Sequence, residues 1–236
     1  MFLTRMFQKS KSLNPTTKIA RAAQATHDFL NAFHRDGHDQ GFIASFGKDT
    51  QSHAGFTYYE AEMHAGVDAV IERVKASDEP TALYDSMVET AEIFACQGMR
   101  DRPWLSITIT DGKDNHSRKY ANNPRRAGDA YRRLMQVGLL PISVLIGVGN
   151  DQEIDENALK TLSDAGGIAF LRAQHMQELA AILLRLTTSI EASVRTITVS
   201  DGQFSISKTT PQAQVHVVPF LYSISLDRSG SMKEEA

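Results

Sequence analysis

Apolar residues along the chain recur at two spacings, one typical of helices and the other typical of buried strands. Spacings of three and four residues predict amphipathic helices, because such positions share one face of a helix. The first helix starts after residues 14–17, where a capping side chain and a proline favour a helix start, and its apolar face is formed by Ile19, Ala23, Thr26, Leu30 and Phe33. The same pattern predicts a helix over residues 63–74, a helix that starts at residue 81, and a separate helix that ends near residue 137. It also predicts helices over residues 159–165 and 176–194.

Continuous apolar runs, rich in β-branched and aromatic residues, predict strands. They occupy residues 41–47, 104–110, 141–149, 166–170 and 217–226, while residues 56–59 form either a minor edge strand or a loop. The final run is long and apolar enough to suit a strand buried on both faces. Because strands alternate with helices, we predict an α/β fold with a doubly wound, mostly parallel central sheet and helices on both faces.

The composition divides the chain into a body over residues 1–197, a connector over residues 198–214, and a C-terminal strand with a polar loop over residues 215–236. Asp201-Gly202 and Thr209-Thr210-Pro211 are typical of turns and linkers, and a small hairpin fits in this connector. We expect the final segment to complete the same domain as the body.

Composition and charge exclude several classes of protein. With 236 residues, of which 42% are hydrophobic, the chain can bury a full core as one α/β domain or at most two small ones. The net charge of −3 comes from interspersed charges without a basic block, so we expect no nucleic-acid partner. No stretch approaches a membrane span and residues 1–12 lack the apolar region of a signal peptide, so we expect no membrane association and a cytoplasmic location.

Several single side chains have ordinary structural explanations. The one cysteine, Cys96, cannot form an internal disulfide, and its place on a predicted helix favours a buried, small apolar side chain. No pair among the eight histidines has zinc-ligand spacing, so we predict no histidine ligand. Lys18 and Arg21 are expected to be exposed helix charges, and Asp114 and Asn115 to be solvated loop residues.

Oxygen-bearing side chains stand at the ends of three predicted elements. Asp227, Ser229 and Ser231 follow the final strand. Thr81 stands at the start of a helix, and Asp111 ends a strand. Carboxylates and hydroxyls are the hard ligands that Mg²⁺ prefers, and these loops can share one edge of a doubly wound sheet. Simpler alternatives exist at each place, namely a polar turn after the final strand, an N-cap for Thr81, and a turn at Asp111-Gly112.

Taken together, three segments resemble the von Willebrand factor type A domain and its metal-ion-dependent adhesion site: Asp227-Arg228-Ser229-Gly230-Ser231, Thr81-Ala82-Leu83-Tyr84-Asp85 and Thr110-Asp111-Gly112. The Ser-Gly-Ser-Met sequence is similar to that of bacterial and intracellular members. The resemblance implies a bound Mg²⁺, with Mn²⁺ as an alternative, whose ligands are Asp227, Ser229, Ser231, Thr81 and Asp111. It also implies that an Asp or Glu of a partner protein completes the coordination, which would make this a divalent-cation-dependent protein-binding module.

The order of these segments departs from that of the family, because the Asp-x-Ser-x-Ser strand comes first there and last here. In one account the domain is circularly permuted, and its final strand returns to the centre of the sheet. In the other, the chain is a slice of a tandem array, and residues 217–236 begin a following domain. An orphan central strand fits the open slot of its own chain or of a second chain, so we expect a monomer or a strand-swapped dimer.

Two other functions compete with protein binding. The strand ending at Asp227 also resembles the start of a haloacid-dehalogenase-type phosphatase, but that family has a second Asp two residues on, where this chain has Ser229. The sequence has no phosphate-binding loop, dinucleotide fingerprint or nucleophile elbow, so we expect that the protein is not an enzyme. The remaining alternative is a fragment of a tandem protein whose metal site is incomplete and binds nothing.

Overall fold

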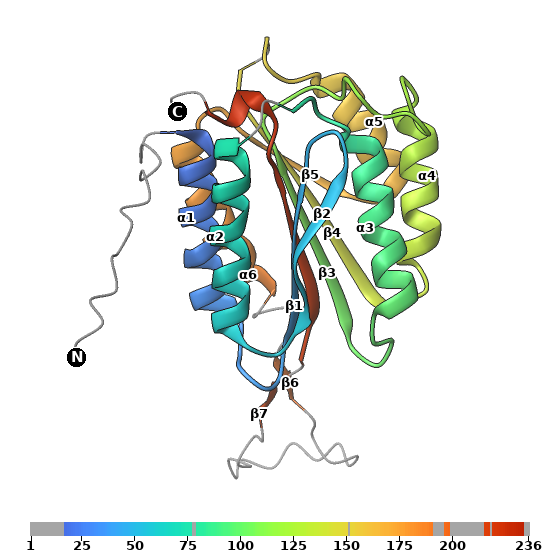
Figure 1. The fold of residues 1–236 in the computed structure, drawn as a ribbon. Coiled ribbons are helices and arrows are strands. Elements are labelled where there is room, and N and C mark those ends of the chain that lie inside the picture. Colours follow the sequence, from blue (N-terminus) through green and yellow to red (C-terminus); the bar gives the residue numbers. More distant parts are fainter. Residues whose placement is uncertain are drawn as a thin grey trace, which may run out of the picture.

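The computed structural model describes residues 17–76, 79–150, 152–190, 196–198, 215–217 and 219–233. Its centre is a six-stranded sheet in the order β2-β1-β8-β3-β4-β5 (Figure 1). The strands of this sheet are β1 (Gln40–Phe46), β2 (Thr50–Thr57), β3 (Pro103–Thr110), β4 (Leu139–Val148), β5 (Ala169–Ala173) and β8 (Leu221–Asp227). Only the edge pair of β1 and β2 is antiparallel among these described strands.

Helices cover both faces of this sheet, as the sequence predicted. They are α1 (Lys18–Phe33), α2 (Glu60–Ala76), α3 (Leu83–Gln97), α4 (Pro124–Met135), α5 (Glu156–Gly166) and α6 (Met176–Ile190). One face packs against α1, α2 and α6, and the other packs against α3, α4 and α5 (Figure 1). The structure is therefore a three-layered, mostly parallel α/β fold, which confirms the predicted fold class.

The last strand, β8, lies in the middle of the sheet, with parallel β1 on one side and parallel β3 on the other. Every residue of Leu221–Asp227 is buried, as expected for a strand covered on both faces. Its side chains alternate between the two layers, since Tyr222 and Ile224 join one core and Leu221 joins the other. The C-terminal segment thus completes the sheet within its own chain.

Most predicted elements occur within a few residues of their expected bounds. The hydroxyl of Thr17 accepts a hydrogen bond from the Ala20 N–H at 3.4 Å, and so caps the first helix as predicted. The edge strand β2 is longer than the predicted 56–59, because its half-exposed residues lack a clear apolar alternation. Two short strands, β6 (Thr196–Thr198) and β7 (Val215–Val217), pair antiparallel beside the predicted connector. Residues 199–214, which form nearly all of that connector, lie outside the described residues.

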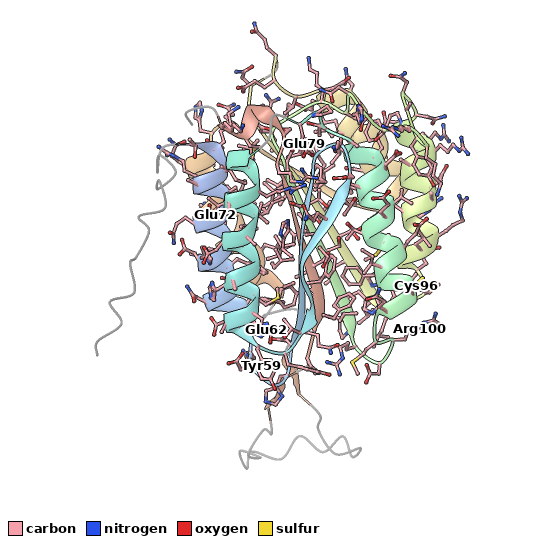
Figure 2. All side chains as sticks on the ribbon, viewed as in Figure 1. Tyr59, Glu62, Glu72, Glu79, Cys96 and Arg100 are labelled. Atoms are coloured by element: carbon pink, nitrogen blue, oxygen red, sulfur yellow. The ribbon has the colours of Figure 1, made fainter. Side chains whose placement is uncertain are left out.

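The exposure of Cys96 and the character of the helices bear on two of the predictions. Cys96 is exposed on the outer side of α3 (Figure 2), so the prediction of a buried cysteine is wrong. The apolar positions of α3 that enter the core include instead those of Met87, Ala91 and Phe94. Among the described residues, no helix is both long enough and apolar enough to cross a membrane.

Candidate metal centre

The oxygen-bearing side chains predicted from the sequence come together at the edge of the sheet where the parallel strands end. Asp227 is the last residue of β8, and Ser229 and Ser231 follow it in a loop and a short 3-10 helix, η2 (Gly230–Lys233). The Ser231 hydroxyl donates a hydrogen bond to Asp111 Oδ1 at 2.8 Å, and the Ser229 and Ser231 hydroxyl oxygens are 2.9 Å apart. The loops after β8 and β3 are therefore joined through their hydroxyl and carboxylate groups.

The surroundings of Gly112 show how closely Thr81, at the start of α3, approaches the loops after β3 and β8. A methyl group placed on its Cα would lie 3.4 Å from Thr81 Oγ1 and 3.9 Å from both Asp227 Oδ2 and Ser231 Oγ. Oxygens from three separate segments thus surround one glycine, whose missing side chain leaves space between them. The structure brings all the predicted ligand residues together, while their role as ligands stays a prediction.

Asp227 is fully buried, and both of its carboxylate oxygens are held in place. Thr110 Oγ1 donates to Oδ2 at 2.6 Å, and the Ser229 N–H donates to Oδ1 at 2.9 Å. Burial, reinforced by the negative charge of Asp111, raises the pKa of Asp227 to about 7. A cation beside this carboxyl group would stabilise its ionised form.

Asp111 faces a cation from the protein itself. The Lys18 ammonium, at the start of α1, is 3.0 Å from Asp111 Oδ2 and 3.1 Å from Glu153 Oε1. Burial raises the pKa of Asp111, and the nearby Lys18 charge only partly offsets this effect. Burial lowers the pKa of Lys18, but the two carboxylates outweigh that effect and raise it above its usual value.

Lys18 was predicted to be an exposed helix charge, and this prediction is wrong because its side chain is only 9% exposed. Glu153, in the loop after β4, is held in turn by the Asn150 N–H, which donates to its Oε2 at 2.7 Å. This backbone hydrogen bond, followed by Lys18, lowers the pKa of Glu153. Lys18 and Glu153 therefore belong to the surroundings of the candidate centre, although the sequence analysis did not include them.

The loop after β3 is fastened to the start of α3. The Asn115 side-chain oxygen accepts from the Thr81 N–H at 2.8 Å, and Asp114 Oδ1 accepts from the Tyr84 N–H at 3.2 Å. In the opposite direction, the carboxylate of Asp85 on α3 accepts hydrogen bonds from the backbone N–H groups of residues 118–120 at 2.7 to 3.1 Å. Asp114 and Asn115 were predicted to be solvated loop residues, and this prediction is wrong because both side chains hold the loop against the start of α3.

The structure does not support the simpler explanation of Thr81 as an N-cap. The N-cap residue of α3 is Ala82 and not Thr81, and the N–H groups of Tyr84 and Asp85 in the first turn are bonded by the side chains of Asp114 and Ser117. Thr81 is 3% exposed, and none of the described residues hydrogen-bonds to its hydroxyl. A hydroxyl in this position, directed at Gly112, remains available to an additional partner.

Arg228 anchors the loop that carries the two serines. Its guanidinium is fully buried and forms ion pairs with Asp49 and Glu79, and Glu79 lies at the same end of the molecule as η2 (Figure 2). Its backbone N–H donates to the Phe46 carbonyl at 2.7 Å, and the Gly230 N–H donates to the Glu79 carbonyl at 3.0 Å. The chain is therefore fixed on both sides of Ser229.

The donors fit a hard divalent cation. Carboxylate and hydroxyl oxygens are the ligands of Mg²⁺, whereas zinc sites are built from Cys, His and carboxylates. In the described part of the chain, no group of three or more His, Cys, Asp and Glu side chains is arranged to hold a metal ion. A site in which hydroxyls outnumber carboxylates is compatible with that finding.

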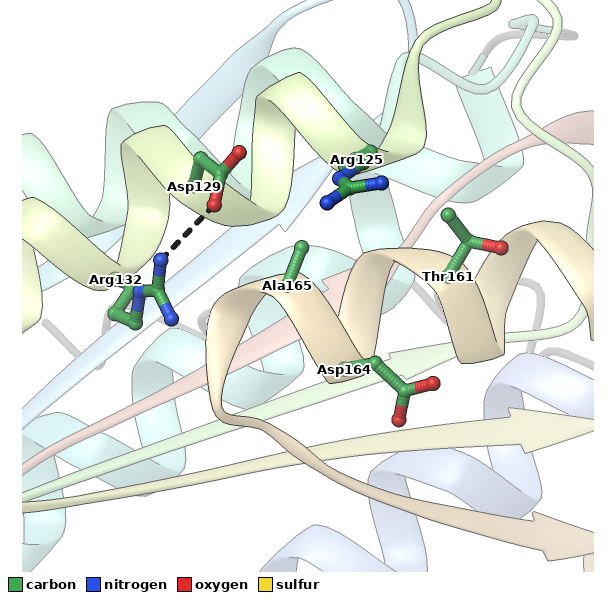
Figure 3. Close-up of a pocket in the computed structure, with 6 residues that line it drawn as sticks. All are labelled: Arg125, Asp129, Arg132, Thr161, Asp164 and Ala165. Carbon is green, nitrogen blue, oxygen red and sulfur yellow. Dashed lines mark hydrogen bonds and ion pairs between the residues drawn. The ribbon is translucent and has the colours of Figure 1, made fainter.

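A separate hollow of about 360 Å³ lies between α4 and α5 (Figure 3). Its lining consists of Arg125, Asp129, Arg132, Thr161, Asp164 and Ala165. The Arg132 guanidinium donates to Asp129 at 3.0 Å, so that opposite charges compensate one another inside the hollow. None of the predicted ligands lines it, and it offers no comparable chemistry.

Several solved structures have a similar fold. A von Willebrand factor type A protein from Catenulispora acidiphila matches with a TM-score of 0.56 and 16% identity over 73% of this chain and 38% of its own. The conserved hypothetical protein BatB from Bacteroides thetaiotaomicron matches with a TM-score of 0.52 and 14% identity over 76% of this chain and 93% of its own.

A third structure, proximal thread matrix protein 1 from the mussel byssus with a zinc-occupied adhesion motif, has a TM-score of 0.54 and 19% identity over 76% of this chain and 43% of its own. The chain thus spans less than half of the first and third of these proteins. Neither a protein-family model nor a curated protein sequence matches it. The structural matches and the sheet order together show that the chain has the fold of the von Willebrand factor type A domain.

Proposed function

We propose that this protein is a divalent-cation-dependent protein-binding module whose metal site is built from Asp227, Ser229, Ser231, Thr81 and Asp111. The observation that carries the proposal is the convergence of these side chains around Gly112, from three segments far apart in the sequence. Mg²⁺ is the cation that these ligands favour, and Mn²⁺ is the alternative. The zinc-occupied adhesion motif of the mussel byssus protein, which has the same fold, supports a metal at this place.

The chain's own residues prepare the site. Thr110 and the Ser229 N–H orient Asp227, while Ser231 orients Asp111. When bound, the metal supplies an electrophilic centre, because only two of its protein ligands are charged and the others are neutral hydroxyls. An Asp or Glu of a partner protein is then a suitable further ligand, since Mg²⁺ keeps exchangeable water positions.

We propose binding and not catalysis for the same site. A phosphatase of the haloacid-dehalogenase type would need the Asp227 carboxylate to be free to attack. Asp227 is 0% exposed, and each of its oxygens accepts a hydrogen bond from Thr110 or Ser229. These contacts favour a carboxylate that holds a cation over one that acts as a nucleophile.

The direct test is calorimetric titration of the chain with Mg²⁺ and Mn²⁺, comparing the unchanged protein with Ser229→Ala. Ser86→Ala is a matched control, because the Ser86 hydroxyl is buried in α3 and has no hydrogen-bond partner among the described residues. We expect one cation per chain, which is lost in Ser229→Ala and retained in Ser86→Ala. Equal cation binding by all three proteins would contradict the proposed site, and absence of binding would support a fragment with an incomplete site.

The carboxylate of a partner can be imitated by acetate. In NMR spectra recorded with Mg²⁺, acetate should shift the backbone amide signals of Gly112 and Ser231. Replacing Mg²⁺ by EDTA should abolish these shifts, because the carboxylate needs the metal as its partner. Acetate shifts that are the same with and without Mg²⁺ would show that the metal does not recruit a carboxylate.

The proposal also covers whether one chain or two form the site. Asp227 belongs to β8, whereas Thr81 and Asp111 belong to the body. Mixing and refolding Thr81→Ala with Asp227→Asn restores an intact site only if strands are exchanged between chains. We expect no restoration of Mg²⁺ binding, because β8 already pairs with β1 and β3 of its own chain. Restored binding in a dimeric fraction would instead show strand swapping.

A further inference from the structure

Two histidine side chains meet between α1 and α2, on a helical surface and not at the sheet edge that carries the candidate metal centre. His27 of α1 and His64 of α2 have their Nδ1 atoms 2.5 Å apart. Their ring centres are 4.8 Å apart, and their ring planes differ by 21°. This separation of centres equals the nitrogen–nitrogen distance plus the two ring radii. The rings therefore lie edge to edge, with the two Nδ1 atoms pointing at each other.

The outer nitrogens of both rings face carboxylates. His27 Nε2 is 3.2 Å from Asp68 Oδ1, and His64 Nε2 is 3.3 Å from Glu60 Oε1. A carboxylate accepts hydrogen bonds, so the tautomer with its proton on Nε2 suits both contacts and leaves a lone pair on each Nδ1. Two lone pairs facing one another at this distance repel, unless a positive charge lies between them.

We propose that His27 and His64 bind a transition-metal cation of the Zn²⁺ class, at a site separate from the proposed adhesion site and independent of its function. Imidazole nitrogens are preferred ligands of Zn²⁺, Cu²⁺ and Ni²⁺, and not of Mg²⁺. A histidine that ligates a metal commonly donates its other N–H to a carboxylate, which fixes the tautomer and the orientation of the ring. Both rings here have that partner, Asp68 for one and Glu60 for the other.

Binding requires both nitrogens to shift and both rings to turn. Tetrahedral zinc with bonds of about 2.0–2.1 Å separates two ligating nitrogens by about 3.3 Å, so the two Nδ1 atoms move apart by somewhat less than ~1 Å, and each ring turns so that its lone pair meets the ion beside the line that joins them. The His27 and His64 side chains are 20% and 26% exposed, so rotation of each ring is unobstructed by a closed core and water can fill the remaining positions.

The helices place these groups by simple periodicity. Glu60, His64 and Asp68 are four residues apart along α2 and share one side of that helix, which faces His27 on α1. Along α1, His27 lies about 13 Å from Lys18 at a rise of ~1.5 Å per residue, so the histidine pair is distant from Asp111. An ion held here would link α1 to α2, the two helices that lie side by side on one face of the sheet (Figure 1).

The test is a Zn²⁺ titration in the presence of excess Mg²⁺, which occupies hard-ligand sites. The unchanged protein is compared with His27→Gln, His64→Gln and the control His38→Gln, which alters an exposed histidine in a turn. We expect one Zn²⁺ per chain, with affinity at least tenfold weaker in His27→Gln and His64→Gln and unchanged in the control. Circular dichroism and Mg²⁺ binding serve to show that each variant is folded.

Two further measurements separate ligation from a packing effect. Nitrogen NMR of the histidine rings should show Zn²⁺ shifting Nδ1 of both His27 and His64, while Mg²⁺ leaves them unchanged. Asp68→Asn keeps both ligands but removes one orienting carboxylate, and it should weaken Zn²⁺ binding by about 10–100-fold. The inference is overturned if the unchanged protein binds no Zn²⁺ under these conditions, or if neither histidine variant alters the binding. Neither result depends on whether a partner protein binds at the sheet edge.

Discussion

Replacing Asp227 by Asn should make the metal-free protein more stable while abolishing metal binding. The substitution keeps the shape of the side chain and removes only its charge. The Ser229 N–H can still donate to the amide oxygen, and Thr110 can rotate its hydroxyl to accept from the new amide group, because a hydroxyl both donates and accepts. The effect on stability then comes mainly from the cost of ionising a buried carboxyl group.

The size of that cost follows from the pKa. In the folded chain the pKa of Asp227 is about 7, whereas its usual value is 3.8. Because the folded-state pKa is the higher one, the protonated group contributes fully below pH ~4, and this contribution is lost as the pH rises towards 7. At pH 8 the loss amounts to about 4 kcal/mol at ~1.36 kcal/mol per pKa unit, which corresponds to a shift in Tm on the order of 10 °C for a domain of this size.

Urea denaturation and thermal melts in EDTA, at pH values from 5 to 8, measure this effect. The unchanged protein should lose stability as the pH rises, and Asp227→Asn should show a flatter profile and a higher Tm at pH 8. Asp164→Asn, which removes an exposed carboxylate between α4 and α5, is the matched control and should leave the profile unchanged. Adding saturating Mg²⁺ should raise the Tm of the unchanged protein and have no effect on Asp227→Asn, because a ligand stabilises only the state that binds it.

Two outcomes would refute this reasoning. If Asp227→Asn is less stable than the unchanged protein in EDTA at pH 8, the carboxylate contributes through its hydrogen bonds more than its burial costs. If the stability of the unchanged protein does not fall between pH 5 and pH 8, Asp227 is not the strained group that the structure indicates. In either case the candidate centre would lack the unfavourable charge that a divalent cation is expected to relieve.

Three further substitutions test the surroundings of the site. Lys18→Met should raise Mg²⁺ affinity about tenfold or more, measured by calorimetry against Lys119→Met, because the ammonium beside Asp111 Oδ2 repels a second cation; unchanged affinity would contradict this. Gly112→Ala should weaken Mg²⁺ binding without loss of fold, because a methyl group 3.4 Å from Thr81 Oγ1 is an ordinary contact yet fills the space between the oxygens; unaltered binding would place the cation elsewhere. Arg228→Met should lower the free energy of unfolding in urea by about 3–5 kcal/mol, because Glu79 loses its buried partner; a loss below ~1 kcal/mol would show the pair to be dispensable.

The sequence was sufficient for the layers of the fold because its strongest signals are local. The apolar run that became β8 indicated a strand buried on both faces, and the structure places it between β1 and β3. The edge strand β2 was largely missed, because half-exposed residues at an edge carry no marked alternation of apolar and polar positions. Its existence depends on pairing with β1, which no short window of sequence displays.

The candidate site could be predicted in part for the same reason. Asp227, Ser229 and Ser231 lie within five residues of one another, so the sequence alone indicates that their oxygen atoms are close together. Lys18 was misjudged because its partner Asp111 is 93 residues away, and a lysine in the first turn of an amphipathic helix is ordinarily exposed. The His27 and His64 pair was missed for a similar reason, since the two residues are 37 positions apart on different helices.

Burial makes the ionised form of Asp227 unfavourable in the metal-free protein. A bound cation would remove this cost, so the same burial would favour the metal-bound state over the metal-free state. Asp227 is the end residue of the central strand, so its carboxylate cannot move into water without disturbing the pairing of β8 with its neighbours. Without a cation, the protein balances Asp111 with Lys18 and leaves Asp227 to its hydrogen bonds. A divalent cation would supply charge to both carboxylates at once, and Lys18 could then remain paired with Glu153. Lys18 thus offers a reason why the protein can stay folded without a metal, because its charge compensates Asp111. The same charge would lower the affinity for a metal ion.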